Sequence, residues 1–452
     1  MLRHFSPTHR RGTTVLAAVW AIAIGSTIVA SVQLFGWRQA MMGQDVTSRI
    51  QARWAARAGV ENTIAVMSDF TERPEPLDAF AMVREMEYVS AGDVGTANYA
   101  IRHWRDDRHW AGPLDEHSRF NVNVVSEGDL MLLQDMTIDV ASAVIDWRDE
   151  DNEPSLLGVE EDYYRALESP YDPRNDHIRT IAELELVAGI WPEYLRGEDW
   201  NLNYQLDPNE NDESATWPMD NPDGRLEGGW AQYLTAYSLD YGATASGLPR
   251  IWLRGATIEE LTERLFIDEL QAEKLLDFGK NLDNVLEQLA VIELSQIDEN
   301  GNVSQQQQQP GQLQPQSGIN QQVGPLTDEQ IIAVLQETSV VHPATRPPGR
   351  MNINTVPQQY LRDLLGDEAL ADEIIFLRDS RAEGIVSMLD LRDIPGLSDD
   401  IWLQLAQRFD TVSNIYTIVS RGTSNATGIT IDMIVVVDRS TLPVRILEYR
   451  EQ

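Results

Sequence analysis

The sequence contains no cysteine and only two lysines, Lys274 and Lys280. Without thiols the chain forms neither disulfides nor thiolate zinc sites, and its cysteine usage does not indicate a cellular compartment. Positive charge is also scarce, because 35 basic residues stand against 72 acidic ones and leave a net charge of −37. Since an acidic surface repels phosphates, this charge argues against broad nucleic-acid binding.

Sequence signatures of catalysis are missing as well. No GxxxxGK[ST] phosphate loop, GxSxG nucleophile elbow or HExxH zinc motif occurs. One group of histidines and aspartates follows a predicted strand, and a membrane-tethered hydrolase that uses it is an alternative interpretation. The members of this group are His103, Asp106, Asp107, His109 and His117. Their spacing matches no metal motif, so we expect no catalytic residues and no enzyme activity.

The most distinctive feature that is present is a long apolar run near the amino terminus. Thr13 to Gly36 spans 24 residues without a charge, and a membrane-spanning helix needs about 20. Arg3, Arg10 and Arg11 precede the run, and basic flanks stay on the cytoplasmic side. The run predicts a single membrane span with a cytoplasmic amino end.

The junction before this run suggests a specific form of processing. Arg10, Arg11 and Gly12 directly precede the apolar residues, which resembles a type IV prepilin leader. Such a leader, here residues 1–12, is cut after the glycine and would expose Thr13. A secretory signal has a shorter apolar region, of about 7–15 residues, that ends at a small-x-small site. From this feature alone, an uncut signal anchor remains the simpler alternative.

The helical pattern continues beyond the membrane. Asp45 to Phe70 contains no proline, and Ile50, Trp54 and Ala58 share one helical face. Together with the span, this segment predicts one rod of about fifty residues that ends near Pro74. Alternating residues predict four strands, at 97–105, Val412–Ser420, Gly428–Val437 and Pro443–Tyr449.

A repeated pattern organises the middle of the chain. One copy runs from Arg119 to Arg148, another from Arg350 to Arg378, and a weaker one from Arg250 to Lys280. The first and last copies are followed by a short helix and an apolar-Gly-apolar turn, within 180–190 and 387–397. This is a helix-hairpin-helix pattern, as found in sterile-alpha-motif-like bundles. Its acidic flanks favour a packing role over DNA binding.

Two polar stretches and one acidic cluster lie between these parts. Residues 205–229 are rich in turn formers, and residues 301–325 form a Gln/Pro-rich linker. The acidic cluster extends from Asp146 to Tyr164. Calcium takes about six to eight oxygen ligands, which such a loop can supply. The EF-hand spacing is absent, so composition alone favours a solvated acidic loop.

Taken together, these blocks resemble the K-type minor pseudopilins of the bacterial type II secretion system. The blocks that carry the resemblance, in family order, are RRG before the apolar helix, ARWAARAGVE (52–61), DEHSRFNVN (115–123), AVIDWRDEDNEP with GVEEDYYR (143–165), SPYDPRND (169–176), TIAELELVAGI (180–190) and RMNINTVP (350–357). Residues 200–345 look like an expanded insertion. The copy that begins at Arg250 has IWLR where the others have NVN and NIN, which departs from the family pattern.

The resemblance implies an α+β fold. A long membrane and pilin helix leads into a pilin-like α/β domain with an antiparallel sheet, and a large helical domain of sterile-alpha-motif-like repeats is inserted into it. The expected divisions are a leader (1–12), the membrane and pilin helix (13–70), the pseudopilin domain (71–118 with 411–452), a first helical domain with the acidic loop (119–200), an expanded insertion with a degenerate repeat (201–300), the linker (301–325) and a last helical domain (326–410).

The resemblance also implies a non-enzymatic filament subunit. Prepilin peptidase would cut between Gly12 and Thr13, and Thr13 would be N-methylated. The subunit would sit in the bacterial inner membrane with its bulk in the periplasm. It would join I- and J-type minor pseudopilins at the tip of a filament of major pseudopilin that serves exported proteins. Ala17 replaces the glutamate of ordinary pseudopilins, as is typical of the K type.

The family's acidic loop binds calcium, which turns the interpretation of the cluster towards a structural calcium site. The matching ligand candidates are Asp149, Asp151, Glu160, Glu161 and Asp162. A DNA-uptake protein, also membrane-anchored and built with helix-hairpin-helix units, is the main alternative function. That alternative requires a basic hairpin surface, which this sequence does not show.

Overall fold

The computed structural model describes residues 11–452 except 214, 239–243, 245–247, 305–322 and 343–348. Residues 1–10 of the predicted leader and most of the predicted linker 301–325 therefore lie outside the described residues. Gly12 and Thr13 lie within the first helix, whose side chains are described from residue 14 onward.

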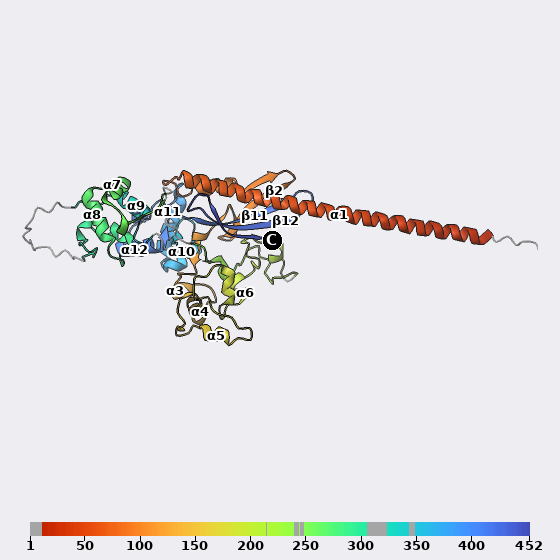
Figure 1. Ribbon diagram of the computed structural model, residues 1–452, viewed down its shortest axis with the longest axis horizontal. Coiled ribbons are helices and arrows are strands. Elements are labelled where there is room, and N and C mark those ends of the chain that lie inside the picture. The colour runs from red at the N-terminus through yellow and green to blue at the C-terminus, as the bar shows by residue number, and fades with distance from the viewer. Residues whose placement is uncertain (1–10, 214, 239–243, 245–247, 305–322, 343–348) are drawn as a thin grey trace, which may run out of the picture.

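Helix α1 (Arg11–Glu72) is a continuous rod of 62 residues. Its first part extends away from the body of the molecule (Figure 1), and its large apolar side chains there are exposed. The helix is long and apolar enough to cross a membrane. Because no proline occurs between Arg11 and Pro74, nothing interrupts the backbone hydrogen bonds. The predicted rod is confirmed, and it ends two residues before that proline.

The second part of α1 packs on an antiparallel sheet of seven strands. The main path runs β1 (Ala91–Val94), β2 (Ala97–Arg105), β11 (Ile415–Ser424), β12 (Thr430–Asp438) and β13 (Arg445–Glu451). Strand β3 (Arg108–Ala111) pairs with β2, and β4 (Leu114–Asp115) pairs with β11. All four predicted strands are therefore confirmed. Pairing of β2 with β11, with Ile101 opposite Ser420, joins the two ends of the chain in one sheet.

The contact between α1 and this sheet depends on small residues. Ala52, Ala55 and Ala56 are fully buried against the strands. At Gly422 in β11, an added Cβ would lie 1.9 Å from the carbonyl oxygen of Ala52, so a glycine is needed for this approach. Helix α2 (Ala81–Tyr88) closes the core, where Met82 and Met86 join the apolar residues of α1 and the sheet.

Three helical units are inserted between β4 and β11. Each begins with a short strand and ends with another that pairs with it in parallel. Strand β5 (Phe120–Asn121) pairs in parallel with β6 (Leu234–Thr235), β7 (Ile251–Trp252) with β8 (Thr338–Ser339), and β9 (Met351–Asn352) with β10 (Phe409–Asp410). We call the three units so closed unit 1, unit 2 and unit 3, in chain order. Their starts coincide with the three repeat copies.

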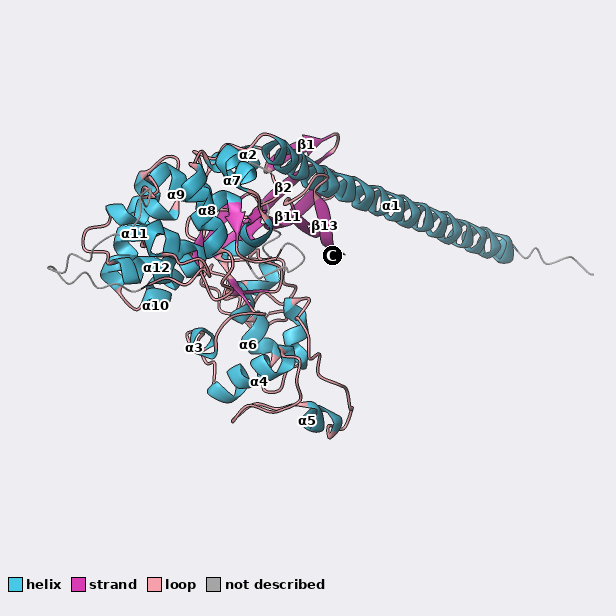
Figure 2. Ribbon diagram, turned by 60° about the vertical axis from the view of Figure 1, so that its left-hand side comes forward, coloured by secondary structure: helices cyan, strands magenta, loops and turns pink. Residues whose placement is uncertain are grey.

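The helices of the units differ in number and length. Unit 1 holds α3 (Glu127–Leu130), α4 (Ile138–Arg148), α5 (Glu161–Arg165) and α6 (Pro192–Arg196); unit 2 holds α7 (Ile258–Leu265), α8 (Glu269–Phe278) and α9 (Asp328–Glu337); unit 3 holds α10 (Gln358–Leu365), α11 (Glu368–Ser380) and α12 (Asp399–Arg408). The short helices predicted in the tails are 3₁₀ turns, at Ile181–Leu186 and Met388–Asp393. In Figure 2, α3 to α6 form a lobe to one side of the sheet.

The units group the chain differently from the predicted domain boundaries. Strand β6 and Trp230, which lie in the predicted insertion 201–300, complete unit 1, and Trp230 is buried in its core. Helix α9, which lies in the predicted last domain 326–410, packs its Val334 into the core of unit 2. The boundaries at residues 200 and 326 therefore separate segments that share a core, because long loops hide the return of the chain.

The repeated residues make the same contacts in units 1 and 3. The Asn123 side chain donates to the Ile178 carbonyl at 3.0 Å and accepts from its N–H at 2.7 Å. Asn354 does the same with Ile385, at 2.9 Å for both hydrogen bonds. In the weaker copy, Arg254 stands at the asparagine position. The asparagine of NVN and NIN is thus a clip that fixes the hairpin tail.

Candidate metal centre

The acidic loop of unit 1 brings three carboxylates together. Asp146 lies in the last turn of α4, Asp149 caps that helix, and Glu160 stands at the amino end of α5. One oxygen of each lies within 4.8 Å of the others. The loop between them folds back over α4, where the Ser155 N–H donates to Asp146 Oδ2 at 3.1 Å.

Gly158 allows this close return of the loop. A Cβ at this position would lie 2.0 Å from Asp146 Oδ2. Asn175 holds the other side of the loop, because its side chain donates to the Asp151 carbonyl at 2.6 Å and its N–H donates to the Trp147 carbonyl at 3.0 Å. The three carboxylates therefore occupy fixed positions.

The charges of this cluster lack compensation from the described protein atoms. Glu160 is 4% exposed, and neither of its carboxylate oxygens has a hydrogen-bond partner among the described residues. Asp149 Oδ1 is also buried and also has no hydrogen-bond partner among the described residues. The neighbouring Arg148 points away and donates to the carbonyls of Val122 and Val125. Buried polar groups normally have partners, so these orphaned oxygens fit a bound cation.

Electrostatics support the same interpretation. Burial, and then the charges of Asp149 and Asp146, raise the pKa of Glu160 to about 7. Burial, followed by Asp151, also raises the pKa of Asp149. Carboxylates that repel one another in this way are stabilised in their ionised form by a divalent cation. Hard oxygen ligands of this kind suit calcium better than softer metals.

The predicted ligand set differs from the observed cluster. Two of the predicted residues, Asp149 and Glu160, belong to the cluster. Its third member, Asp146, was not in the predicted set. Asp151 instead accepts from the Glu153 N–H at 2.8 Å. Glu161 pairs with Arg165, and Asp162 is exposed. Asp146 lies in the last turn of α4 and Asp149 caps the same helix three residues later. A spacing of three residues brings side chains together at a helix end, and this spacing was the signal in the sequence that could have identified Asp146.

The histidine and aspartate group identified in the sequence does not form a metal site within the described residues. His103 and His117 are buried, and each uses Nδ1 on a backbone carbonyl, that of Gly112 and that of Arg350, both at 3.0 Å. His109 packs edge-on against Trp104, with ring centroids 4.9 Å apart. His103 thus ties β2 to the residue after β3, and His117 joins the sheet domain to the start of unit 3.

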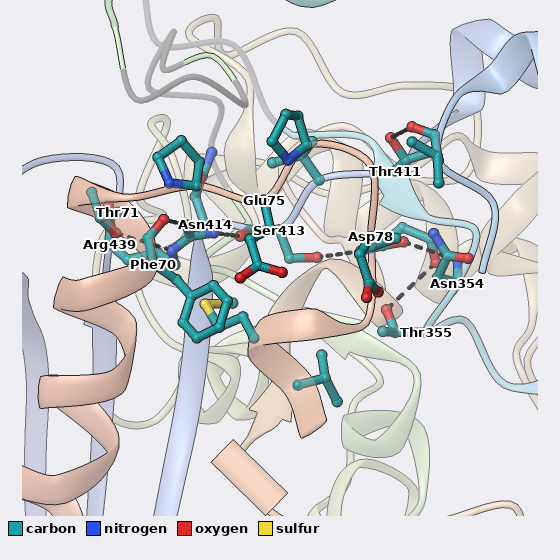
Figure 3. A pocket seen from close by; sticks show the side chains of 18 of the residues that line it. Phe70, Thr71, Glu75, Asp78, Asn354, Thr355, Thr411, Ser413, Asn414 and Arg439 are labelled. Atoms are coloured by element: carbon teal, nitrogen blue, oxygen red, sulfur yellow. Dashed lines mark hydrogen bonds between the residues drawn. The ribbon is translucent and has the colours of Figure 1, made fainter. Parts of the chain in front are cut away.

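A small cavity of about 100 Å³ lies where α1 ends (Figure 3). Arg439, which follows β12, donates to the Phe70 carbonyl at 3.3 Å and to the Ser413 carbonyl at 3.2 Å. Burial lowers the pKa of Arg439. A guanidinium on a terminal helix carbonyl complements the helix dipole. The walls of this cavity therefore form a structural junction between α1 and the sheet.

In this fold a long apolar amino-terminal helix packs on an antiparallel sheet, and helical units are inserted between two of its strands. Residues 118–197 match the family model described as Type II secretion system (T2SS), protein K. The matched segment contains Asp146, Asp149 and Glu160.

A curated relative points to the same family. The chain is 27% identical over 206 residues to the Type II secretion system protein K of Pectobacterium carotovorum subsp. carotovorum. This match covers 40% of the chain and 59% of the relative, so the chain spans less than two thirds of that protein. The predicted resemblance to the K-type protein is confirmed by these two sequence matches.

A solved structure shows a weaker similarity. The GspK-GspI-GspJ complex from the enterotoxigenic Escherichia coli Type 2 Secretion System aligns with a TM-score of 0.44 and 13% identity. The alignment covers 91% of this chain and 99% of the other.

Proposed function

We propose that this chain is a minor pseudopilin of a type II secretion system, placed at the tip of the pseudopilus. There it initiates filament assembly and supports protein export across the outer membrane. The observation that carries the proposal is the match of residues 118–197 to protein K, inserted into a sheet that packs on a long apolar helix.

The anchor supports a tip position in particular. Ala17 stands where ordinary pseudopilins carry the glutamate that pairs with the amine of a neighbouring subunit. A subunit with no other stacked above it does not need that pair, and a buried charge in a bilayer is costly. The inserted units add bulk beside the sheet, which suits the end of a filament better than its repeating shaft.

We expect the partners to be I- and J-type minor pseudopilins, followed by the major pseudopilin. Beyond the membrane, α1 offers exposed apolar side chains for such contacts, with Ile50 at 52% and Trp54 at 58% exposure. Prepilin peptidase would process the leader between Gly12 and Thr13, and Thr13 would be methylated. The exported proteins themselves are further candidate partners.

A deletion and complementation experiment tests this function. The producing bacterium without this chain should fail to release its type II substrates into the medium, and the full chain should restore release. Tagged full chain should also co-purify with the I- and J-type subunits from membranes. Restored secretion by a chain that lacks residues 118–197 would contradict the proposal.

Processing is tested separately, by mass spectrometry of the amino terminus. Protein from cells with prepilin peptidase should begin at methylated Thr13, and cells without the peptidase should yield the intact leader. An intact leader in both strains would contradict the pseudopilin assignment.

We also propose that Asp146, Asp149 and Glu160 hold a structural calcium ion. Calcium should raise the thermal midpoint of the full-length protein in detergent relative to EDTA, and Asp146→Asn or Glu160→Gln should abolish this rise. Asp162→Asn is the matched control, because it removes an equal charge from the exposed side of α5. An equal response of all three variants would reject this ligand set.

A further inference from the structure

A second cavity, of about 400 Å³, lies between the sheet domain and unit 3. One wall comes from α2, β2 and β3, and the other from residues 354–358 and 378–382. Ligand sites often form where two such bodies meet. This cavity is remote in sequence from the acidic loop and shares no residue with it.

The walls of this cavity carry an unusual share of the chain's positive charge. Five of the 35 basic residues line it, namely Arg84, Arg105, Arg108, Arg378 and Arg381. Four acids line it as well, namely Glu87, Asp106, Asp115 and Asp379, so five minus four leaves one positive charge. The chain as a whole carries −37. The net charge of the side chains that line the cavity is therefore positive, whereas the net charge of the whole chain is negative.

Most of these charged groups already have protein partners. Asp115 accepts from Thr355 at 2.5 Å and from Ser413 at 2.6 Å. Asp379 accepts from Arg378 at 3.0 Å. Arg381 donates to an aspartate of its own unit, and Arg84 donates to the Ala382 carbonyl at 3.0 Å. These groups build the walls. Arg105 also donates to the Thr355 carbonyl at 3.1 Å, but its Nε has no hydrogen-bond partner among the described residues, and Arg108 is exposed, so these two arginines are left to face a ligand.

The pairing of β2 with β3 aligns the remaining groups. His103 lies opposite Trp110, and Arg105 lies opposite Arg108. Directly opposed residues share one face of a sheet, so all four side chains are on the same side. The guanidinium carbons of Arg105 and Arg108 lie 4.3 and 4.0 Å from the centroid of the Trp110 ring, which fixes both cations by cation–π contact.

Two buried nitrogen atoms in this wall lack hydrogen-bond partners among the described residues, Arg105 Nε and His103 Nε2. The carboxylate oxygen paired with Arg105 Nε, Asp106 Oδ2, is 3.5 Å away. His103 is 5% exposed. Its Nδ1 lies 3.0 Å from the Gly112 carbonyl, and because a carbonyl only accepts, Nδ1 carries the proton and Nε2 is a bare acceptor. Burial, and then Arg105, lower the pKa of His103 to about 3, so the ring is neutral at pH 7.

We propose that this cavity binds a carboxylate that has an N–H donor beside it, as in an aspartyl residue. Arg105 and Arg108 receive the carboxylate, and His103 Nε2 accepts the N–H. Two sources share this chemistry, an acidic segment of another protein and a free acylated amino acid. The inference goes beyond the proposed function and does not depend on it.

Isothermal titration of the full-length protein in detergent tests the chemistry. The probes are N-acetyl-aspartate N-methylamide, succinate, which lacks the donor, and inorganic phosphate. We expect the aspartyl probe to bind about tenfold more tightly than the other two, as one good hydrogen bond in a buried site warrants. Equal binding of all three, or no binding of the aspartyl probe, would overturn the proposal.

Variants locate the site. Arg108→Gln should weaken binding of the aspartyl probe by about tenfold, because it removes one charge-assisted contact from an exposed residue. Arg102→Gln is the matched control on β2, since its side chain is on the opposite face, and it should bind as the original protein does. Arg105→Gln also loses the bond to the Thr355 carbonyl, so its thermal midpoint is measured alongside. Equal effects of Arg102→Gln and Arg108→Gln would overturn the assignment.

The source is resolved by one further probe, the peptide Ala-Ala-Asp-Ala-Ala with blocked ends. Tighter binding of the peptide than of the single residue supports the site with a protein segment as its occupant. Tighter binding of the single residue supports it with a small acid. If the peptide and the single aspartyl residue do not displace one another, they bind at different places, and the proposal of one shared site would be overturned.

Discussion

At the scale of single residues, the acidic loop shows how burial changes the ionisation of the three carboxylates for which we propose a cation. Glu160 is buried beside Asp146 and Asp149, and the described part of the chain offers it no donor. The pKa of Glu160 is therefore raised to about 7 from an ordinary 4.5. A metal-free folded chain holds a proton there that the unfolded chain releases.

This linkage predicts a pH-dependent difference between the original protein and Glu160→Gln. In EDTA the two should be similar in stability at and below about pH 4.5. The variant should become increasingly the more stable one between about pH 4.5 and 7, because in that window the unfolded carboxyl ionises while the folded one keeps its proton, and the difference should level off above about pH 7. In calcium the order should reverse. Thermal midpoints across this window provide the measurement, and an EDTA difference that does not depend on pH would contradict the prediction.

The asparagine clips provide a second residue-level prediction. Asn123→Ala and Asn354→Ala should each lower the free energy of unfolding by about 1–3 kcal/mol, because each leaves a backbone N–H and a carbonyl unpaired. Arg254→Ala, at the corresponding place in unit 2, should change it by less than about 0.5 kcal/mol. Chemical denaturation of the three variants checks this order, and equal losses would show that the asparagines have no special role.

The asparagines and the clustered carboxylates show which single-residue contacts can be predicted from the sequence. The repeated letters NVN and NIN predict a repeat, but the partners Ile178 and Ile385 are distant in the chain, and no local pattern identifies them. In the cluster of three carboxylates, Asp149 and Glu160 were expected from the resemblance. Asp146 was not expected, because its place in the cluster depends on which side of α4 is buried, and the tertiary fold determines that side.

At the scale of elements, the contact of α1 with β11 depends on the absence of a single carbon atom. The Cβ of an alanine at position 422 would lie 1.9 Å from a backbone oxygen of the helix. Backbone cannot move aside as a flexible side chain can. The helix and strand would have to separate along the face that both bury.

Gly422→Ala should therefore destabilise the protein by about 1–3 kcal/mol, the usual cost of overpacking. Gly43→Ala in the exposed part of α1, where a Cβ meets nothing within 4 Å, should be neutral or stabilising by up to about 1 kcal/mol. Thermal unfolding in detergent compares the two. Equal stability of both variants would show that the helix does not approach the sheet so closely.

Elements were the most predictable level of this fold. The rod and four strands follow from the apolar run, the lack of proline from Asp45 to Phe70 and the alternation in residues such as those of 428–437. Short strands such as β5 and β6 were not predictable, because two residues carry no period. Their pairing depends on the return of loops that have no regular pattern of their own.

At the scale of the whole molecule, one sheet unites residues from both ends of the chain. Strand β2 forms hydrogen bonds with β11 across the three inserted units. The core under α1 draws on Tyr99 and Ile101 from the early part and on Ile418 and Val435 from the late part. The early strands β1, β2 and β3 pair with one another, but the other edge of β2 and the core under α1 stay incomplete until the late strands arrive.

Removal of residues 411–452 should consequently unfold the sheet domain, and limited proteolysis should cut between residues 73 and 118. Removal of residues 443–452 alone deletes β13 at the edge and keeps β2, β11 and β12 together, so the same sites should stay protected. Mass spectrometry of the fragments identifies the cuts. If the sites between residues 73 and 118 stay protected in the chain that lacks residues 411–452, the early strands fold without the late ones.

The order of this sheet has a consequence for the timing of assembly. The chain is synthesised from its amino end, so α1 is made before β11 and β12. Its inner face, lined by Ala52, Ala55 and Ala56, has no cover during that interval. A product that stops before β11 would keep this face open. Completion of the sheet thus decides whether the inner face of α1 is covered, so exposure of that face distinguishes an unfinished chain from a folded one.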